Sequence, residues 1–222
     1  MLKKVKSQGD YKNYFTSSRP EMLKFIPHNS RRILEVGCGE GNFGLSVKGK
    51  INCEYWGIEP FKDAAQTAKT KLDFVLNSNF DDAYDKLERN FFDCVVFNDV
   101  LEHFANPFDT LSKLFDIMPV GSSIIASIPN VRYAGNLYEL LIKRDWEYKH
   151  EGGILDFTHL RFFTKKSTVR MFNQSGYEII QIVGINPISI KKFLPINIIT
   201  LGMFSDSRYL QFAVVAKKTI ER

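Results

Sequence analysis

A glycine-rich turn directly after a short apolar segment is the part of this chain that most clearly points to chemistry. Residues 33–36 are bulky and mostly apolar, as expected for a buried central strand. Gly37, Gly39 and Gly41 then allow a tight turn and a close approach of the backbone to a ligand, because they carry no Cβ. A helix that begins near Asn42 would point unpaired N–H groups at that ligand. The turn therefore predicts a site for a nucleotide-type cofactor.

Two carboxylates stand at positions that suit such a cofactor. Glu35 precedes the glycines, where a negative charge suits a ligand that carries cationic groups and suits a pyrophosphate poorly. Glu59 ends a second expected strand, eighteen positions after Gly41, and an acid there can accept hydrogen bonds from both ribose hydroxyls. The alternative for Glu59 is an exposed carboxylate in a loop. Gly39, Gly41 and Gly44 also fit the spacing of a dinucleotide site, so the glycines alone do not separate the two cofactor classes.

Three segments together separate them, because they resemble the class I S-adenosylmethionine-dependent methyltransferases. Glu35 to Gly41 resembles the E/D-x-G-x-G-x-G motif of that family. Residues 99–103, Asp-Val-Leu-Glu-His, resemble the D-V-L-E-H segment of the subgroup that includes the ubiquinone-biosynthesis O-methyltransferases. Residues 121–130 resemble the fifth strand of that subgroup, P-G-G-x-L-x-x-S-x-P-N, with Val120 in place of the first glycine.

The resemblance covers roughly residues 30–185 and implies methyl transfer with S-adenosyl-L-methionine as the cofactor. It implies that Asn79 and Phe80 lie against the adenine and that Asn98 lies near the methionine end. The complete set of cofactor-binding residues that it implies is Glu35, Gly37, Gly39, Gly41, Glu59, Pro60, Asn79, Phe80 and Asn98.

An insert rich in aromatic and polar residues is expected at residues 129–163, where this fold places substrate-binding additions. Residues 153–164 resemble G-I-L-D-x-T-H-L-R-F-F-T, a string associated with methyltransferases of surface-glycan and nucleotide-sugar gene neighbourhoods. The sulfonium makes the methyl group electrophilic, so the protein must align the acceptor atom. A sugar hydroxyl must also lose its proton, and His159 in the insert and His103 after the fourth strand are the candidate bases.

Asp156 and Arg161 complete the predicted catalytic group. Asp156 would orient the imidazole of His159, and Arg161 would hold a phosphate or carboxylate of the substrate. Tyr133 and Trp146 are expected to form apolar walls of the same cleft. The alternatives are that the insert residues brace one another and that the histidine after the fourth strand caps or packs the next helix.

No metal site is predicted. Asp99, Glu102 and His103 lack a recognised ligand spacing, and so do Asp156 and His159.

Charge and composition limit the partners. The net charge of +5 comes from scattered basic pairs, which indicates a solvated surface that would also suit an anionic acceptor such as a nucleotide sugar. Residues 98–101 do not form the Asn/Asp-Pro-Pro-aromatic motif of base amino-methyltransferases, and no nucleic-acid partner is expected. The sequence contains no run of 18 apolar residues, so no transmembrane helix is expected. The three cysteines resemble the packed thiols of a reduced compartment, so a cytoplasmic location is expected.

The order of the predicted elements alternates between strands and helices. Strands are expected near 33–37, 54–58, 73–77, 93–97, 122–128, 177–184 and 209–217. Helices are expected near 11–26, 43–49, 61–71, 81–89, 107–117, 134–144 and 165–175. This order predicts an α/β fold with one Rossmann-like, mostly parallel seven-stranded sheet, helices on both faces and an antiparallel last strand.

We expect residues 1–222 to form a single domain. The apolar segment 186–206, which Pro195 and Gly202 interrupt, would be a substrate lid, a homodimer contact, a membrane-surface patch or part of the core. The expected function is methyl transfer to a hydroxyl of a sugar, nucleotide sugar or other small polar acceptor of surface-glycan biosynthesis. The alternatives are a quinone-type or other small-molecule O-methyltransferase and a cofactor-binding scaffold without turnover.

Overall fold

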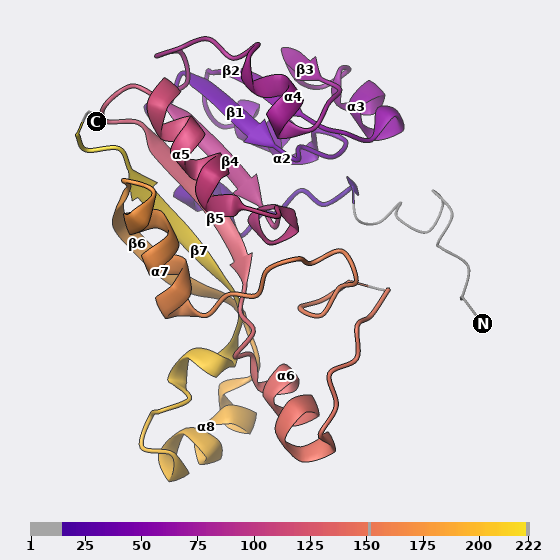
Figure 1. Ribbon diagram of the computed structural model, residues 1–222, viewed down its shortest axis with the longest axis vertical. Coiled ribbons are helices and arrows are strands. Elements are labelled where there is room, and N and C mark those ends of the chain that lie inside the picture. Colours follow the sequence, from indigo (N-terminus) through magenta and orange to yellow (C-terminus); the bar gives the residue numbers. More distant parts are fainter. Residues whose placement is uncertain (1–14, 151, 221–222) are drawn as a thin grey trace.

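The computed structural model describes residues 15–150 and 152–220, and a seven-stranded sheet lies at its centre (Figure 1). The strands are β1 Arg32–Val36, β2 Glu54–Ile58, β3 Phe74–Leu76, β4 Cys94–Asn98, β5 Ser123–Pro129, β6 Glu178–Pro187 and β7 Tyr209–Lys217. Their order across the sheet is β3-β2-β1-β4-β5-β7-β6. Neighbouring strands are parallel, except that β7 is antiparallel to both β5 and β6. The predicted Rossmann-like sheet with an antiparallel last strand is confirmed.

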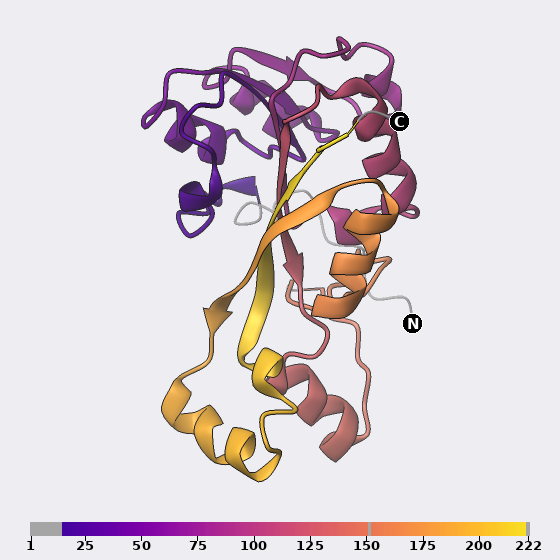
Figure 2. The same ribbon diagram turned by 90° about the vertical axis from the view of Figure 1, so that its left-hand side faces the viewer.

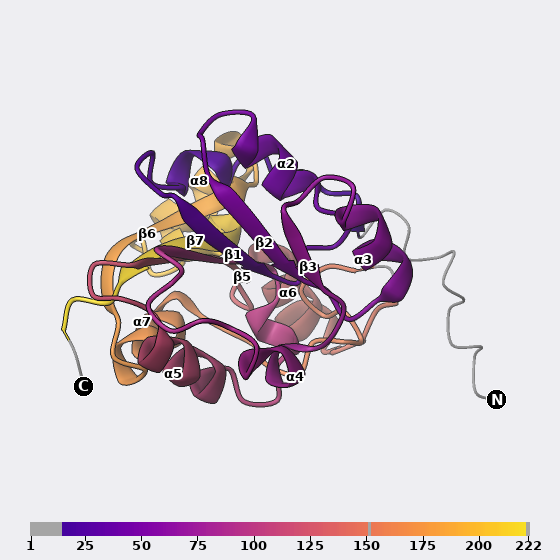
Figure 3. The same ribbon diagram turned by 90° about the horizontal axis from the view of Figure 1, so that it is seen from above.

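Helices cover both faces of this sheet, as predicted. The α-helices are α2 Asn42–Lys48, α3 Lys62–Ala68, α4 Phe80–Tyr84, α5 Pro107–Ile117, α6 Ala134–Tyr138, α7 Lys165–Gln174 and α8 Ile190–Ile199. Seen from above, α2 and α3 lie on one side of the sheet and α4, α5 and α7 on the other (Figure 3).

The strands form because their side chains bury both faces of the sheet. In β4, Val95 and Phe97 pack into the core cluster beneath α5 and α7, whereas Cys94 and Val96 pack into the cluster beneath α2 and α3. Successive side chains of a strand point to opposite faces, so a continuous apolar run is the pattern that a doubly covered strand requires.

The helix predicted at 11–26 is wrong over residues 16–26. Residues 11–14 lie outside the described residues, Phe15 is helical, and from Thr16 onward the chain is irregular apart from a 3-10 turn at Leu23–Phe25. Arg19 precedes Pro20, which disfavours the helical conformation, and Arg19 adopts φ 43°. The proline therefore prevents a helix that the apolar spacing alone suggested.

The two segments of interest beyond the sheet core contain short helices. The helix expected at 134–144 is α6 followed by a π-helical turn at Glu139–Lys143. The segment 186–206 completes β6, forms α8 and enters the 3-10 turn Ser205–Arg208. Figures 1 and 2 show α6 and α8 together at one end of the molecule, beyond the carboxyl end of β5.

Helix α7 begins directly after Thr164, the residue expected to cap it. Thr164 caps the helix by accepting a hydrogen bond from Ser167 N, and the Ser167 hydroxyl accepts one from Thr164 N in return. This reciprocal capping box fixes where the insert ends and the helix begins.

Candidate active site

The glycine turn after β1 has the left-handed backbone that its residues permit. Gly37, Gly39 and Gly41 have φ values of 74°, 54° and 77°, and Gly37 N donates to Ile58 O at 2.8 Å. A Cβ on Gly37 would lie 2.6 Å from Cγ2 of Val100. The turn is therefore pressed against the loop that follows β4, and any side chain there would collide.

Glu59 holds this turn in place from the end of β2. Its Oε2 accepts a hydrogen bond from Gly39 N at 2.8 Å, and its Oε1 accepts one from Phe61 N at 3.0 Å. Burial raises the pKa of the carboxyl, and these two hydrogen bonds act in the opposite direction. Each carboxylate oxygen can accept more than one hydrogen bond, so the predicted contact with ribose hydroxyls is compatible with these bonds.

Glu35 lies buried at the end of β1 beside β4. Asn98 Nδ2 donates to its Oε1 at 2.9 Å and the Tyr55 hydroxyl donates to its Oε2 at 3.1 Å. Burial raises the pKa of Glu35 to about 8, despite the lowering effect of both hydrogen bonds. Within the described part of the chain, Asn98 Oδ1 is buried and has no hydrogen-bond partner. A polar ligand group at this end of the sheet would satisfy it.

The other predicted cofactor residues follow β2 and β3. Asn79 caps α4, because its Oδ1 accepts from Asp82 N at 2.9 Å, and the Phe80 side chain lies in the core with 2% of its surface exposed. Both side chains thus have structural partners, and their contact with adenine stays a prediction. Pro60 is exposed, and Asn77 Nδ2 donates to its carbonyl oxygen at 3.1 Å.

The N-terminal part of the described chain lies over the glycine turn, which the sequence did not indicate. Phe15 O accepts a hydrogen bond from Glu40 N at 3.1 Å, and the Phe15 ring lies 5.0 Å from the ring of Phe61. A Cβ on Gly39 would lie 2.9 Å from Phe15 O. This segment therefore packs against the glycine turn at Gly39, where the turn has no side chain.

Arg19 anchors the same segment to the carboxyl end of the sheet. Its guanidinium pairs with the Asp99 carboxylate and donates to the Ser127 hydroxyl at 2.9 Å. Gln211 Nε2 donates to the same Asp99 carboxylate at 2.7 Å. Asp99 and Ser127 lie in motifs visible in the sequence, but no local signal identifies Arg19 as their partner.

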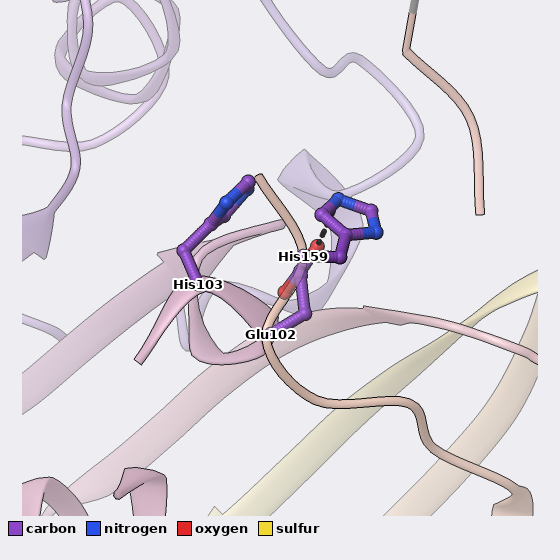
Figure 4. A group of neighbouring side chains, drawn as sticks. All are labelled: Glu102, His103 and His159. Atoms are coloured by element: carbon purple, nitrogen blue, oxygen red, sulfur yellow. Dashed lines mark ion pairs between the residues drawn. The ribbon is translucent and has the colours of Figure 1, made fainter. Parts of the chain in front are cut away.

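A cluster of Glu102, His103 and His159 lies next to this network, where the insert meets the loop after β4 (Figure 4). Glu102 and His103 belong to the 3-10 turn Leu101–His103, and His159 comes from the insert. His159 Nε2 lies 3.9 Å from Glu102 Oε1, and the two imidazole centroids are 4.7 Å apart. The sequence singled out both histidines and grouped His103 with Glu102 and Asp99, but it paired His159 with Asp156, because the contact between His159 and Glu102 is long-range.

Backbone carbonyls orient both imidazoles. His103 Nδ1 lies 3.1 Å from Thr158 O, and His159 Nδ1 lies 2.8 Å from Ile154 O. A carbonyl oxygen can only accept, so Nδ1 carries the proton in each ring and Nε2 of the neutral ring is the acceptor. Burial is the main cause that lowers the pKa of His103, and the neighbouring His159 lowers it further.

Glu102 joins the insert to the sheet edge through its backbone and side chain. Its carbonyl oxygen accepts from Leu160 N at 2.9 Å and from Arg161 N at 3.0 Å. Its side chain is 1% exposed, and no described residue donates a hydrogen bond to either carboxylate oxygen. Burial raises the pKa of this carboxyl well above its usual value, and Asp99 adds to the effect.

Asp156 does not orient His159 through its side chain, contrary to the expectation. Its carboxylate accepts from the backbone N–H and the hydroxyl of Thr158. The Arg161 guanidinium donates to Ala105 O and is exposed. These contacts favour the bracing alternative for Asp156, because its hydrogen bonds stay within the insert.

A hollow of about 280 Å³ opens within the insert, between α6 and residues 152–155. Its lining residues include Tyr133, Asn136, Lys149 and Ile154. Asp156, His159 and Arg161, which were expected to share a cleft with Tyr133, do not line it. Trp146 does not line it either and instead stacks edge-on against Phe162 at 5.4 Å. Ile154 connects the hollow to the histidine cluster, since its carbonyl oxygen holds His159.

The end of the molecule formed by α6 and α8 exposes apolar side chains. The most exposed of them are Ile142, Ile198, Ile199, Leu201 and Met203. Over the residues described, no helix has the length and apolar character that crossing a membrane requires.

A Rossmann-like sheet whose carboxyl edge carries a glycine turn between two buried carboxylates is the architecture of an α/β enzyme with a nucleotide-type cofactor. The profile of the family described as "Methyltransferase domain" matches residues 9–182, so the chain belongs to this methyltransferase family. It is an S-adenosylmethionine-dependent methyltransferase, and S-adenosylmethionine is its cofactor.

Solved structures support this fold. An S-adenosylmethionine-dependent methyltransferase from Archaeoglobus fulgidus has 19% identity and a TM-score of 0.71, over 94% of this chain and 97% of that one. A possible histamine N-methyltransferase from Thermotoga maritima has 17% identity and a TM-score of 0.63, over 94% and 91%. A methyltransferase from Listeria monocytogenes has 16% identity and a TM-score of 0.61, over 89% and 95%. No curated protein matches the sequence.

Proposed function

We propose that this enzyme transfers the methyl group of S-adenosylmethionine to a hydroxyl of a sugar, nucleotide sugar or similar small polar acceptor of surface-glycan biosynthesis in the cytoplasm. The observation that carries the proposal is the hollow between α6 and residues 152–155 of the insert, which adjoins the histidine cluster through Ile154. In this proposal, residues 129–163 form the acceptor-binding part of the molecule.

The lining of the hollow suits a polyhydroxylated acceptor. Tyr133 offers an aromatic face, and Asn136, Glu147 and Lys149 offer hydrogen-bond donors and acceptors of both charges. A volume of about 280 Å³ is close to the lower limit of about 300 Å³ for small-molecule sites. A single sugar unit therefore fits better than a long chain.

The reaction requires alignment and removal of one proton. The hydroxyl oxygen forms a bond to the methyl carbon while the carbon–sulfur bond breaks. The electron pair of the carbon–sulfur bond goes to sulfur. His103 and His159 are the side chains of the cluster whose Nε2 atoms can accept a proton or orient the hydroxyl. Arg161, which is exposed beside this cluster, would hold an anionic group of the acceptor.

The loop after β4 favours a second candidate. Because residues 99–103 resemble the ubiquinone-type O-methyltransferases, a catechol-like phenol would be the acceptor in that case. Such a phenol has neighbouring hydroxyls like those of a sugar but a flat apolar ring, so the two acceptor classes can be compared directly.

The test is transfer of an isotopically labelled methyl group to nucleotide sugars, monosaccharide glycosides and catechols, read by mass spectrometry. We expect labelled product from a sugar-containing acceptor, and much less from the Glu59→Ala variant when the cofactor is subsaturating, because its affinity for the cofactor is lower. Labelling of catechols alone would replace the first candidate by the second. Tight cofactor binding without any labelled product would favour a scaffold without turnover.

A further inference from the structure

We propose that Glu102, His103 and His159 form a binding site for one divalent transition-metal ion such as Mn²⁺ or Zn²⁺. One ligand atom from each of the three side chains lies within 4.8 Å of the others. Ligands bound to one such ion at about 2.0–2.2 Å lie roughly 3–3.5 Å apart. Small side-chain rotations are therefore sufficient to bring the three atoms to coordination distance.

The buried carboxylate is the first observation that points to a ligand. Both oxygens of Glu102 are buried without a hydrogen-bond donor among the described residues, although its carbonyl oxygen has two. A buried polar group without a partner is rare and destabilising, which calls for a missing partner. Figure 4 shows this carboxylate directed toward the ring of His159, with the ring of His103 on its other side.

The orientation of the imidazoles is the second observation. Each Nδ1 is held by a backbone carbonyl oxygen, Thr158 O for His103 and Ile154 O for His159. Histidines that bind a metal usually donate their other N–H to a carbonyl or carboxylate, which fixes the tautomer and presents the second nitrogen to the ion. Both rings of this cluster have that arrangement.

The ligand set indicates the class of metal. Two imidazoles and one carboxylate suit Mn²⁺, Fe²⁺, Co²⁺ or Zn²⁺, whereas Mg²⁺ and Ca²⁺ prefer oxygen ligands. Asp99 is not part of the set, because Arg19, Ser127 and Gln211 occupy its carboxylate. Three protein ligands leave open positions for water or an acceptor oxygen.

The site lies where an ion could act on the acceptor. On one side, Val100 touches the glycine turn at Gly37, and on the other, Ile154 lines the hollow. With both Nε2 atoms bound to the ion, the histidines would not accept the proton; an acceptor hydroxyl on the ion would become more acidic and would lose its proton to water. Its oxygen then attacks the methyl carbon as the carbon–sulfur bond breaks toward sulfur. This role rests on the proposed hydroxyl methylation, but metal binding itself does not.

The experiment measures metal binding first and activity second. The full chain is stripped with a chelator and titrated with MnCl₂, ZnCl₂ or MgCl₂, with calorimetry for affinity and Mn²⁺ electron spin resonance for nitrogen ligands. We expect one Mn²⁺ or Zn²⁺ per chain, with nitrogen couplings, and weaker binding of Mg²⁺. Glu102→Gln and His159→Gln should each weaken metal binding by about 10-fold to 100-fold or more. His150→Gln, a change of another histidine of the insert, should leave binding unchanged.

Three results would overturn the site. They are no binding of any of the three ions to protein that still binds S-adenosylmethionine, unchanged affinity in both cluster variants, and a bound Mn²⁺ without nitrogen couplings. The last result needs no variant, so it decides even if Glu102→Gln fails to fold. Methyl transfer that persists in excess chelator would remove the catalytic role while the proposed function stands. Metal binding without any methylated acceptor would leave the site intact and contradict the proposed function.

Discussion

His159 Nε2 lies 3.9 Å from Glu102 Oε1, so a residue of the insert and a residue of the loop after β4 face each other across a buried contact. The backbone strengthens this connection, because Glu102 O accepts hydrogen bonds from Leu160 N and Arg161 N. The insert is thereby fastened to the sheet edge that carries the cofactor turn. Substitutions in the insert should therefore affect the loop after β4, and substitutions in that loop should affect the insert.

The two histidines should act as one unit. If they share one ion, His103→Ala and His159→Ala should each lower the single-turnover rate by at least about 10-fold, the lower end of the range for damage to a metal site. The double variant should lose little more, since residues that act together are not additive. Rates at saturating cofactor would test this. If only His159→Ala loses rate, it is the general base, and if only His103→Ala does, the roles are reversed.

Replacing Glu59 should weaken cofactor binding. The Glu59→Ala variant removes the predicted ribose contacts and also the acceptor for Gly39 N and Phe61 N. Hydrogen bonds to a charged group contribute about 1.5–3 kcal/mol each, so we expect affinity to fall at least 10-fold. Calorimetry with S-adenosylhomocysteine is the measurement, and Asp63→Ala on the exposed side of α3 is the control. Equal affinity of both variants would remove Glu59 from the site.

Glu35 should make stability and cofactor binding depend on pH. Its folded-state pKa of about 8 lies above the usual 4.5, so its contribution to stability is complete below pH 4.5 and is lost as the pH rises toward 8. The size of this loss is on the order of a few kcal/mol. Glu35→Gln should flatten the decline between pH 5 and 8, as measured by denaturant unfolding. A variant with the same pH profile as the native chain would contradict the prediction.

The cofactor should reverse part of this effect. Its ammonium group favours the ionised form of Glu35, so affinity for S-adenosylmethionine should rise with pH up to about 8. The rise should be absent in Glu35→Gln. Calorimetry in buffers of different ionisation enthalpy would detect the proton released on binding.

The contact between Gly37 and Val100 should make the glycine turn intolerant of any side chain. Gly37→Ala places a Cβ 2.6 Å from Val100 Cγ2 in a left-handed conformation, so we expect about 1–3 kcal/mol of destabilisation beyond backbone strain. Gly121→Ala is a matched control, with φ 87° and nothing within 4 Å of the added Cβ. Adding Val100→Ala should restore part of the loss. No difference between the two glycine variants would show that the turn relaxes freely.

Loss of the Arg19 anchor should loosen the segment over the glycine turn. Arg19→Ala removes the pair with Asp99 and the bond to Ser127, so amide exchange at residues 15–22 should accelerate. Cofactor should dissociate faster, since Phe15 covers the turn at Gly39. Arg19→Lys, which keeps the charge without the planar fork, should show an intermediate effect. Unchanged exchange in Arg19→Ala would show that the segment is held elsewhere.

The features that the sequence predicted well are those with local signals. Strand, glycine turn and Glu59 follow one another within thirty residues, and the antiparallel β7 follows from the resemblance to a known fold. The helix α8 was missed because Pro195 argues against a helix, although the structure continues it through that residue. The cluster around Glu102 was missed for another reason, since its third member comes from a distant insert and no spacing rule relates them.

The position of β7 between β5 and β6 has a consequence for how the protein is made. Strand β6 is synthesised before β7, but within the described sheet it pairs with β7 only. Until residues 209–217 leave the ribosome, β5 presents an unpaired edge and β6 has no sheet to join. The C-terminal half of the nascent chain is therefore the last to become ordered and is the part most exposed to aggregation. Slow synthesis should therefore increase the yield of folded protein.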